Sequence, residues 1–276
     1  MIVVRDLSVS PWPEKRCVLT IGAYDGVHRG HQAVIAAVRE QVGKGITAML
    51  PTTDAAIVSG LLRDRFGLPL WQFTVSATDA NRHVIRYSRM ITGRSKIIVI
   101  DRCYHGSVDE SFATLDNQGN TVAREGNIGA PVELDQTTRV VAFNNLDDMK
   151  RALEHNDVAA ILMEPAMTNV GIVLPQPGYL KAVEKLAKEF GAKLIIDETH
   201  TISVGPGGMT AQLGLQPDFL TIGKSIGGGF PTGAFGMSAE IAQAIKSQVE
   251  LEVIDTGGVG GTLAANALSL AAMRAT

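Results

Sequence analysis

The sequence predicts an α/β domain built on a mainly parallel β-sheet. Short apolar runs alternate with helical patterns along the chain, which is the order of elements in a parallel sheet with crossover helices. Several of these runs are apolar on both faces, as expected of strands that helices cover on both sides. A chain of 276 residues is long enough for one large domain or two modest ones, with an ample core.

Seven apolar runs have the length and composition of strands: residues 18–22, 96–101, 139–143, 159–163, 193–197, 219–222 and 233–237. Helical patterns are found at residues 31–42, 54–66, 78–91, 147–154, 178–190, 239–249 and 262–276. The clearest helix is 178–190, because Pro177 precedes it and Gly191 follows it at the C-cap position. Ligands of open α/β sheets bind beyond the carboxyl ends of strands, so residues that follow these runs are site candidates.

The composition of the chain argues against several classes of binding partner. A net charge of -3, with 19% charged residues, gives no reason to expect nucleic acid or an anionic membrane as a partner. Cys17 and Cys103 lie far apart without metal-ligand spacing, so we expect reduced cysteines and no metal. No apolar run approaches the roughly 18 residues that a membrane helix needs. We therefore expect a cytoplasmic protein.

A lysine and an acidic pair follow two of the predicted strands. Lys224 lies in a glycine-rich run, and Asp197 with Glu198 lies at the end of another apolar run. A lysine amine forms a Schiff base with an aldehyde, and an aspartate keeps a pyridine nitrogen protonated, so that the ring acts as an electron sink. The pair is therefore typical of an enzyme that uses pyridoxal 5′-phosphate (PLP).

Each of these residues also has a simpler interpretation. Lys224 has the surroundings of a surface lysine in a glycine loop, and Gly223-Lys224-Ser225 looks like the end of a phosphate-binding P-loop. That loop would need a glycine where Asp218 stands. An aspartate such as Asp197, taken alone, is a helix N-cap or a metal ligand as often as it is a cofactor partner. The two residues together favour the cofactor interpretation.

Further candidates follow strands or open helices. Tyr104, next to His105, follows a predicted strand and is either a ring that stacks on a pyridine or a core tyrosine. The run Ser76-Ala77-Thr78 opens a helix, where it either binds a phosphate or forms an ordinary N-cap.

Two more segments have equally open interpretations. His200 follows the acidic pair and is either functional or a polar loop residue. The glycine-rich run 257–261 leads to Thr262 and either holds a phosphate or simply turns the chain.

From about Ala33 to the C-terminus the chain resembles the class III (subgroup II) PLP-dependent aminotransferases. It is most similar to the branch that contains glutamate-1-semialdehyde 2,1-aminomutases. The matching stretches include VSATDAN, TGRSKIIVIDRCYHG, AAILMEP, LIIDETHT, PDFLTIGKSIGGGFPTGAFG and GGTLAANALSLAAM, in family order. The resemblance implies the large domain of PLP fold type I, with a seven-stranded mixed sheet. It also implies transamination or aminomutation between a small-molecule amino donor and a keto or aldehyde acceptor, in a homodimer.

The resemblance also implies residue roles. Lys224 would be the Schiff-base lysine and proton shuttle, Asp197 would pair with the pyridine nitrogen, and Tyr104 would stack on the ring. Glu164 would lie near the ring hydroxyl. The remaining cofactor-binding residues would be Ser76, Ala77, Thr78, His105, His200 and, toward the neighbouring subunit's phosphate, Thr262.

The chain departs from the family pattern in three places. Ala77 and Asp79 replace the glycine and glutamate of the usual Ser-Gly-Thr-Glu-Ala loop. Thr199 and His200 stand where valine and a small or apolar residue are common. The family also continues beyond residue 276 into a small C-terminal domain. We therefore expect residues 33–276 to be a large domain that lacks its small domain.

Residues 1–32 resemble a different family, the bacterial bifunctional riboflavin kinase/FMN adenylyltransferases. The run VLTIGAYDGVHRGHQ contains an H-x-G-H signature, in which His28 and His31 would face nucleotide phosphates. This resemblance implies a nucleotidyltransferase-like fragment at the N-terminus. It leaves two alternatives to an aminotransferase, which are nucleotidyl transfer by that motif and an inactive fusion fragment.

Overall fold

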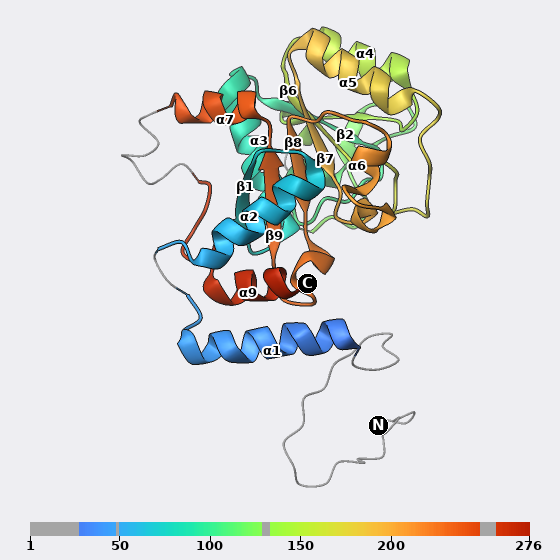
Figure 1. The fold of residues 1–276 in the computed structure, drawn as a ribbon. Helices are drawn as coiled ribbons and strands as arrows, with labels where there is room; N and C mark the ends of the chain where they lie inside the picture. The colour runs from blue at the N-terminus through green and yellow to red at the C-terminus, as the bar shows by residue number, and fades with distance from the viewer. Residues whose placement is uncertain (1–27, 48–49, 129–132, 249–257) are drawn as a thin grey trace, which may run out of the picture.

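A seven-stranded mixed sheet forms the centre of the protein (Figure 1). The computed structural model describes residues 28–47, 50–128, 133–248 and 258–276. The strands lie in the order β1-β9-β8-β7-β6-β2-β5. Their bounds are Leu70–Thr74 (β1), Lys96–Ile100 (β2), Thr138–Val141 (β5), Val158–Met163 (β6), Lys193–Asp197 (β7), Phe219–Ile222 (β8) and Gly233–Met237 (β9). Only β9 runs antiparallel to its neighbours, so the prediction of a mainly parallel sheet is confirmed.

Helices cover the sheet, and a small hairpin lies beside it. The helices are α1 (Arg29–Lys44), α2 (Thr53–Phe66), α3 (Ala77–Thr92), α4 (Leu146–Glu154), α5 (Tyr179–Phe190), α6 (Gly208–Gln212), α7 (Ala239–Lys246) and α9 (Ala267–Ala275). The hairpin joins β3 (Ala113–Leu115) to β4 (Thr121–Ala123). Within the described residues, no helix has both the length and the apolar character needed to cross a membrane.

Two apolar clusters hold the layers together. Helix α3 packs across β1, β9, β8, β7 and β6, and α4 lies beside α5 against β5 and β7 (Figure 1). Their side chains form one large core with β2, β6 and β7. A second core joins α2 and α9 to β8 and β9, and it includes Val58, Leu220 and Leu270. Burial of both sets of apolar side chains is the main stabilising contribution to this arrangement.

Strand register brings the predicted site segments to one edge of the sheet. In the parallel pairs, Met163 lies opposite Ile196, and Asp197 lies opposite Thr221. The residues that follow β6, β7 and β8 therefore emerge side by side. Parallel pairing of β2 with β6 adds the segment after β2, which contains Tyr104.

Most predicted elements are confirmed within two residues at each end, and the remaining ones differ as follows. Strand β1 was not predicted, because its burial is uneven and it is defined by antiparallel pairing with β9. Helix α6 was also missed, since it has only five residues. The predicted helix 262–276 begins only at Ala267, because the Asn266 side chain caps it by accepting from the Ser269 amide. The predicted helix 239–249 ends at Lys246, and the predicted strand 18–22 lies outside the described residues.

Candidate functional site

A pocket of about 640 Å³ lies at the carboxyl edge of the parallel strands. Eight of the predicted site residues line it: Ser76, Ala77, Thr78, Tyr104, His105, Asp197, His200 and Lys224. Glu164 does not line the pocket but contacts His200. Thr262 lies in an exposed turn and is not among the lining residues. Sequence segments more than 140 residues apart thus meet in one cavity.

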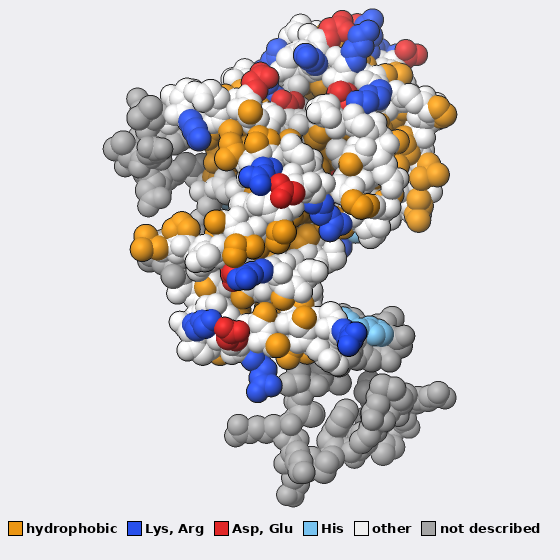
Figure 2. Space-filling view, in the orientation of Figure 1, with side chains coloured by type: hydrophobic (Ala, Val, Ile, Leu, Met, Phe, Trp, Pro, Cys, Tyr) orange, Lys and Arg blue, Asp and Glu red, His pale blue; other side chains and the backbone are white. Residues whose placement is uncertain are grey.

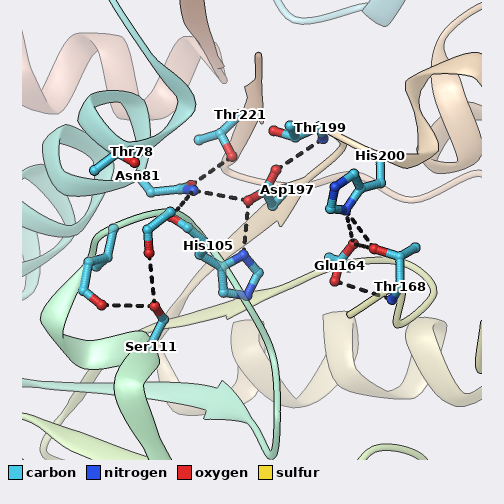
Figure 3. Close-up of polar contacts among 12 residues, drawn as sticks. Thr78, Asn81, His105, Ser111, Glu164, Thr168, Asp197, Thr199, His200 and Thr221 are labelled. Carbon is cyan, nitrogen blue, oxygen red and sulfur yellow. Dashed lines mark hydrogen bonds and ion pairs between the residues drawn. The ribbon is translucent and has the colours of Figure 1, made fainter. Parts of the chain in front are cut away.

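Asp197 is a buried carboxylate with one oxygen saturated by hydrogen bonds. Its Oδ2 accepts from Asn81 Nδ2 and from His105 Nδ1, each at 2.9 Å (Figure 3). Its Oδ1 accepts from the amide of Thr199 at 3.0 Å. Burial raises the pKa of this carboxyl, but the hydrogen bond and charge of His105, with Thr199 and Asn81, lower it to about 2. The carboxylate is therefore ionised at neutral pH, and its Oδ1 can accept one more donor.

His105 forms an ion pair with Asp197 behind the pocket. Its side chain is fully buried. Burial opposes the charged imidazolium, yet Cys103 and the Asp197 carboxylate favour it and raise the pKa of His105 to about 10. The histidine therefore donates to Asp197 and contributes positive charge next to it.

Asn81 completes the support of Asp197, and the sequence analysis missed it. Its side-chain amide donates to the His105 carbonyl at 3.1 Å and to Asp197, while its oxygen accepts from Thr221 Oγ1 at 2.7 Å. The residue is fully buried. The sequence did contain a signal for this role. Asn81 is a polar residue on the apolar face of α3, next to Ala80 and one turn before Val84, and a buried polar residue needs partners.

The start of α3 is a candidate anion-binding turn. Ser76 Oγ caps the helix by accepting from the Asp79 amide at 3.1 Å and donates to the Asp79 carboxylate. Thr78 Oγ1 accepts from the Ser107 amide. Both predicted hydroxyls are therefore engaged with protein. The first intrahelical hydrogen bond has Ala80 as its donor, so the amides of Ala77 and Thr78 have no acceptor within the helix.

Glycines allow this turn to pack closely against its neighbours. A Cβ on Gly223 would lie 2.8 Å from the methyl group of Ala77. A Cβ on Gly106 would overlap Thr78, and one on Gly233 would overlap the backbone of Ser76. The methyl group of Ala77 is therefore accommodated where Gly223 has no side chain.

Lys224 carries the amine of the pocket. It follows β8 with a left-handed backbone (φ 51°), which costs a non-glycine residue free energy and is typical of functional sites. The residue is exposed, and its Nζ forms no hydrogen bond or ion pair with any described residue. Tyr104 lies at the pocket with 41% of its surface exposed, so it is not a core tyrosine.

His200 is held by its Nδ1 atom. Nδ1 lies 3.1 Å from Glu164 Oε2 and 2.5 Å from Thr168 Oγ1 (Figure 3). Thr168 also donates to Glu164. The Glu164 carboxylate is only 4% exposed. This cluster joins the end of β6 to the loop after β7.

Glu198 has a structural role and does not face the pocket. It is fully buried. Its carboxylate accepts from the hydroxyls of Thr201 and Thr210 and from the amides of Met209 and Thr210. It therefore ties the loop after β7 to the start of α6.

The two histidines of the H-x-G-H motif lie at the start of α1, outside the pocket. His28 is the N-cap residue of α1, and it forms a reciprocal capping box with His31. Helix α1 packs against α9 (Figure 1). Residues 1–27 lie outside the described residues, so a nucleotide-binding role for this motif stays a prediction.

Known proteins resemble this chain over most of its length. The family model for class-III aminotransferases matches residues 16–276. A glutamate-1-semialdehyde 2,1-aminomutase from Ignicoccus hospitalis is 35% identical over 217 residues, which are 77% of this chain and 51% of the relative. The crystal structure of a glutamate-1-semialdehyde-aminomutase from Pseudomonas aeruginosa PAO1 has a TM-score of 0.86 and 49% identity, over 88% of this chain and 55% of that one.

A variant of that Pseudomonas enzyme in complex with PMP has a TM-score of 0.83 and 48% identity, with the same coverage of 88% and 55%. The chain thus spans about half the length of the relatives that it matches. The family match, the shared sheet and the pocket at its carboxyl edge agree. This chain belongs to the class-III aminotransferase family.

Proposed function

We propose that this chain binds PLP in the pocket and is the large domain of an enzyme that carries out transamination or aminomutation. One observation carries the proposal: a lysine amine that has no partner among the described residues lines the same pocket as a buried, ionised aspartate. The family match and the PMP complex of the Pseudomonas relative support it.

The residues present fit this cofactor. Asp197 Oδ1 retains a lone pair for a protonated ring nitrogen, because the Thr199 amide is its one donor in the part of the chain that the structure describes. The amides of Ala77 and Thr78, at the positive end of α3, suit a phosphate. The Thr199 hydroxyl lines the pocket, is buried, and has no hydrogen-bond partner among the described residues. Such an atom is unfavourable until a ligand or water satisfies it.

Each residue then has a defined task. When bound, the cofactor supplies an electron-withdrawing ring that accepts the electron pair left on the substrate carbon. Lys224 would hold the cofactor through its Nζ, and the same amine, when free, would accept and return a proton. Asp197 keeps the proton on the ring nitrogen, while Asn81 and His105 orient the carboxylate. Tyr104, which lines the pocket, would contact the cofactor ring and limit the access of water.

The proposed substrates are a small amino donor and a keto or aldehyde acceptor. Aminomutation is included because the relatives above carry that name. We further propose a homodimer, in which Thr262 contacts the phosphate in the neighbouring subunit, and a cytoplasmic location. The exposed position of Thr262 outside its own pocket is compatible with such a contact.

The test is covalent capture of PLP. Added PLP should produce the visible absorbance band of the lysine-bound form, and borohydride should trap the cofactor on Lys224. Lys224→Ala should lose the band, whereas Lys246→Ala on α7 is a control that should keep it. Equal trapping by Lys224→Ala and the parent protein would show that the assignment is wrong.

A further inference from the structure

The second ring nitrogen of His105 is buried beside a cysteine. Nδ1 of His105 lies 2.9 Å from Asp197 Oδ2, and the whole side chain is buried. Nε2 is also buried and forms no hydrogen bond of ordinary geometry with any described residue. Cys103, which is only 3% exposed, is close enough to act on His105 both by hydrogen bonding and by charge. The thiol of Cys103 is therefore the candidate partner for Nε2.

The backbone around this cysteine and histidine is fixed from both sides. Arg102, which precedes Cys103, has a left-handed backbone (φ 59°) that is unfavourable for a non-glycine residue. Arg124, which follows β4, donates to the Cys103 carbonyl at 2.7 Å. Asn81 in α3 donates to the His105 carbonyl at 3.1 Å. Contacts from two other elements thus hold the thiol and the imidazole in place.

The charge of His105 determines what Nε2 requires. Burial lowers the pKa of His105, but Cys103 and Asp197 together raise it to about 10, so both ring nitrogens carry a proton at neutral pH. The proton on Nδ1 is donated to Asp197. The proton on Nε2 needs an acceptor, because a buried donor without one is unfavourable. Sulfur accepts weakly as a thiol and more strongly when it is charged.

We propose that Cys103 Sγ accepts a hydrogen bond from His105 Nε2, and that Cys103 is a positioning residue that acts on Asp197 through the imidazole. The contact itself is formed by the protein alone. Its consequence for PLP rests on the proposed function, because Asp197 lines the pocket. Without the acceptor, His105 favours its neutral form, which is a weaker donor to Asp197. The carboxylate is then held less firmly, and PLP binds less tightly.

The experiment is a pH titration of the cofactor-free full chain with nitrogen-15-labelled histidine, followed by NMR. The shifts of the ring nitrogens report whether each one is protonated, and the His105 signals are those that disappear in His105→Asn. The parent is compared with Cys103→Ala and Cys103→Ser. The control is Val108→Ala, which changes a fully buried apolar residue of the same loop. The other titratable groups near the imidazole stay unchanged, and they are Asp197 and, among the residues lining the pocket, Tyr104, His200 and Lys224.

Cys103→Ala should lower the titration midpoint of His105 by about one pH unit or more, because the variant lacks the group that accepts from the imidazolium. Cys103→Ser keeps an oxygen acceptor and should recover part of this shift. Val108→Ala should lower the stability of the loop and leave the midpoint unchanged. In a PLP titration of the same proteins, affinity should fall about fivefold in Cys103→Ala and by less in Cys103→Ser.

An unchanged His105 midpoint in Cys103→Ala would show that the thiol is not the partner of Nε2. An equal fall in Val108→Ala would assign the effect to packing of the loop and would also overturn the inference. If Cys103→Ala does not fold, Cys103→Ser gives the same answer, because serine is close to cysteine in size.

The PLP titration separates this inference from the proposed function. If the parent forms the borohydride-sensitive band and Cys103→Ala binds PLP equally well, Cys103 does not act on Asp197. If the parent forms no such band, the proposed function fails, and the NMR midpoints still establish or exclude the contact between Cys103 and His105.

Discussion

Asn81 Nδ2 lies 2.9 Å from Asp197 Oδ2, so a side chain from the first turns of α3 orients the carboxylate at the end of β7. The same amide also donates to the His105 carbonyl and accepts from Thr221. One buried residue thus links the predicted phosphate turn, the loop after β2, and strands β7 and β8. The position of the carboxylate depends on tertiary packing as well as on the end of its own strand.

Asn81→Ala should weaken both the fold and PLP binding. The change leaves Thr221 and the His105 carbonyl without their partner, and an unsatisfied buried group costs about 1–3 kcal/mol. Denaturant unfolding and PLP titration measure the two effects. Ser88→Ala on the same helix is the control, because Ser88 is equally buried but only bonds its own helix backbone. If both variants lose stability while PLP affinity is unchanged, Asn81 does not orient Asp197 for the cofactor.

Thr199→Val should have opposite effects on the free and the loaded protein. The substitution keeps the shape but removes a buried hydroxyl without a partner, so the cofactor-free protein should gain about 1 kcal/mol of unfolding free energy. The loaded protein should lose affinity for PLP if a ligand satisfies that hydroxyl. Thr210→Val is the matched control and should destabilise both forms, since its hydroxyl donates to Glu198. Destabilisation of the free protein by Thr199→Val would show that the hydroxyl already has a partner.

Gly223→Ala should disturb the phosphate turn. Its new Cβ would lie 2.8 Å from the Ala77 methyl, closer than two carbons tolerate, so PLP affinity should fall at least several-fold. The double variant with Ala77→Gly should recover part of the affinity, because it removes the closest atom of the clash and leaves the residue-77 amide nitrogen at 3.2 Å. Gly43→Ala, in α1 with open space around it, should leave affinity unchanged. A double variant that binds no better than Gly223→Ala alone would exclude this clash as the cause.

The Asp197–His105 pair predicts how stability depends on pH. The pKa of Asp197 is lowered from 3.8 to about 2, so its contribution is present above 3.8 and is lost as pH falls toward 2. The pKa of His105 is raised from 6.5 to about 10, so its contribution is complete below 6.5 and is lost as pH rises toward 10. Unfolding free energies measured from pH 6.5 to 10 should therefore decline, and His105→Asn should flatten the decline. An equal slope in parent and variant would contradict the assignment.

The fold class and most of the pocket residues could be predicted from the sequence, because both depend on local patterns. Runs such as Lys193–Asp197 are apolar on both faces, and residues at the ends of parallel strands meet at one edge, so Lys224 and Asp197 were found together. Strand β1 was missed because antiparallel pairing with β9 defines it. Asn81 was missed because a polar residue inside a helix shows its partners only after folding.

The distribution of side chains on the surface shows why the roles of other sequence motifs could not be predicted. Acidic and basic side chains are interspersed over the face shown in Figure 2, and apolar side chains gather around α1, α2 and α9. Individual motifs on such a surface, including the two histidines at the start of α1, have no single interpretation. Glu198 illustrates the same limit, because its neighbour Asp197 serves the pocket while Glu198 ties α6 to the loop after β7.

The most direct test of the central claim is peptide mapping of the PLP-treated, borohydride-reduced protein. The account predicts one major labelled peptide, modified at Lys224, and a large loss of this label in Asp197→Ala, which removes the carboxylate that holds the ring nitrogen. Label spread over exposed lysines such as Lys188 and Lys246, with no enrichment at Lys224, would contradict the account.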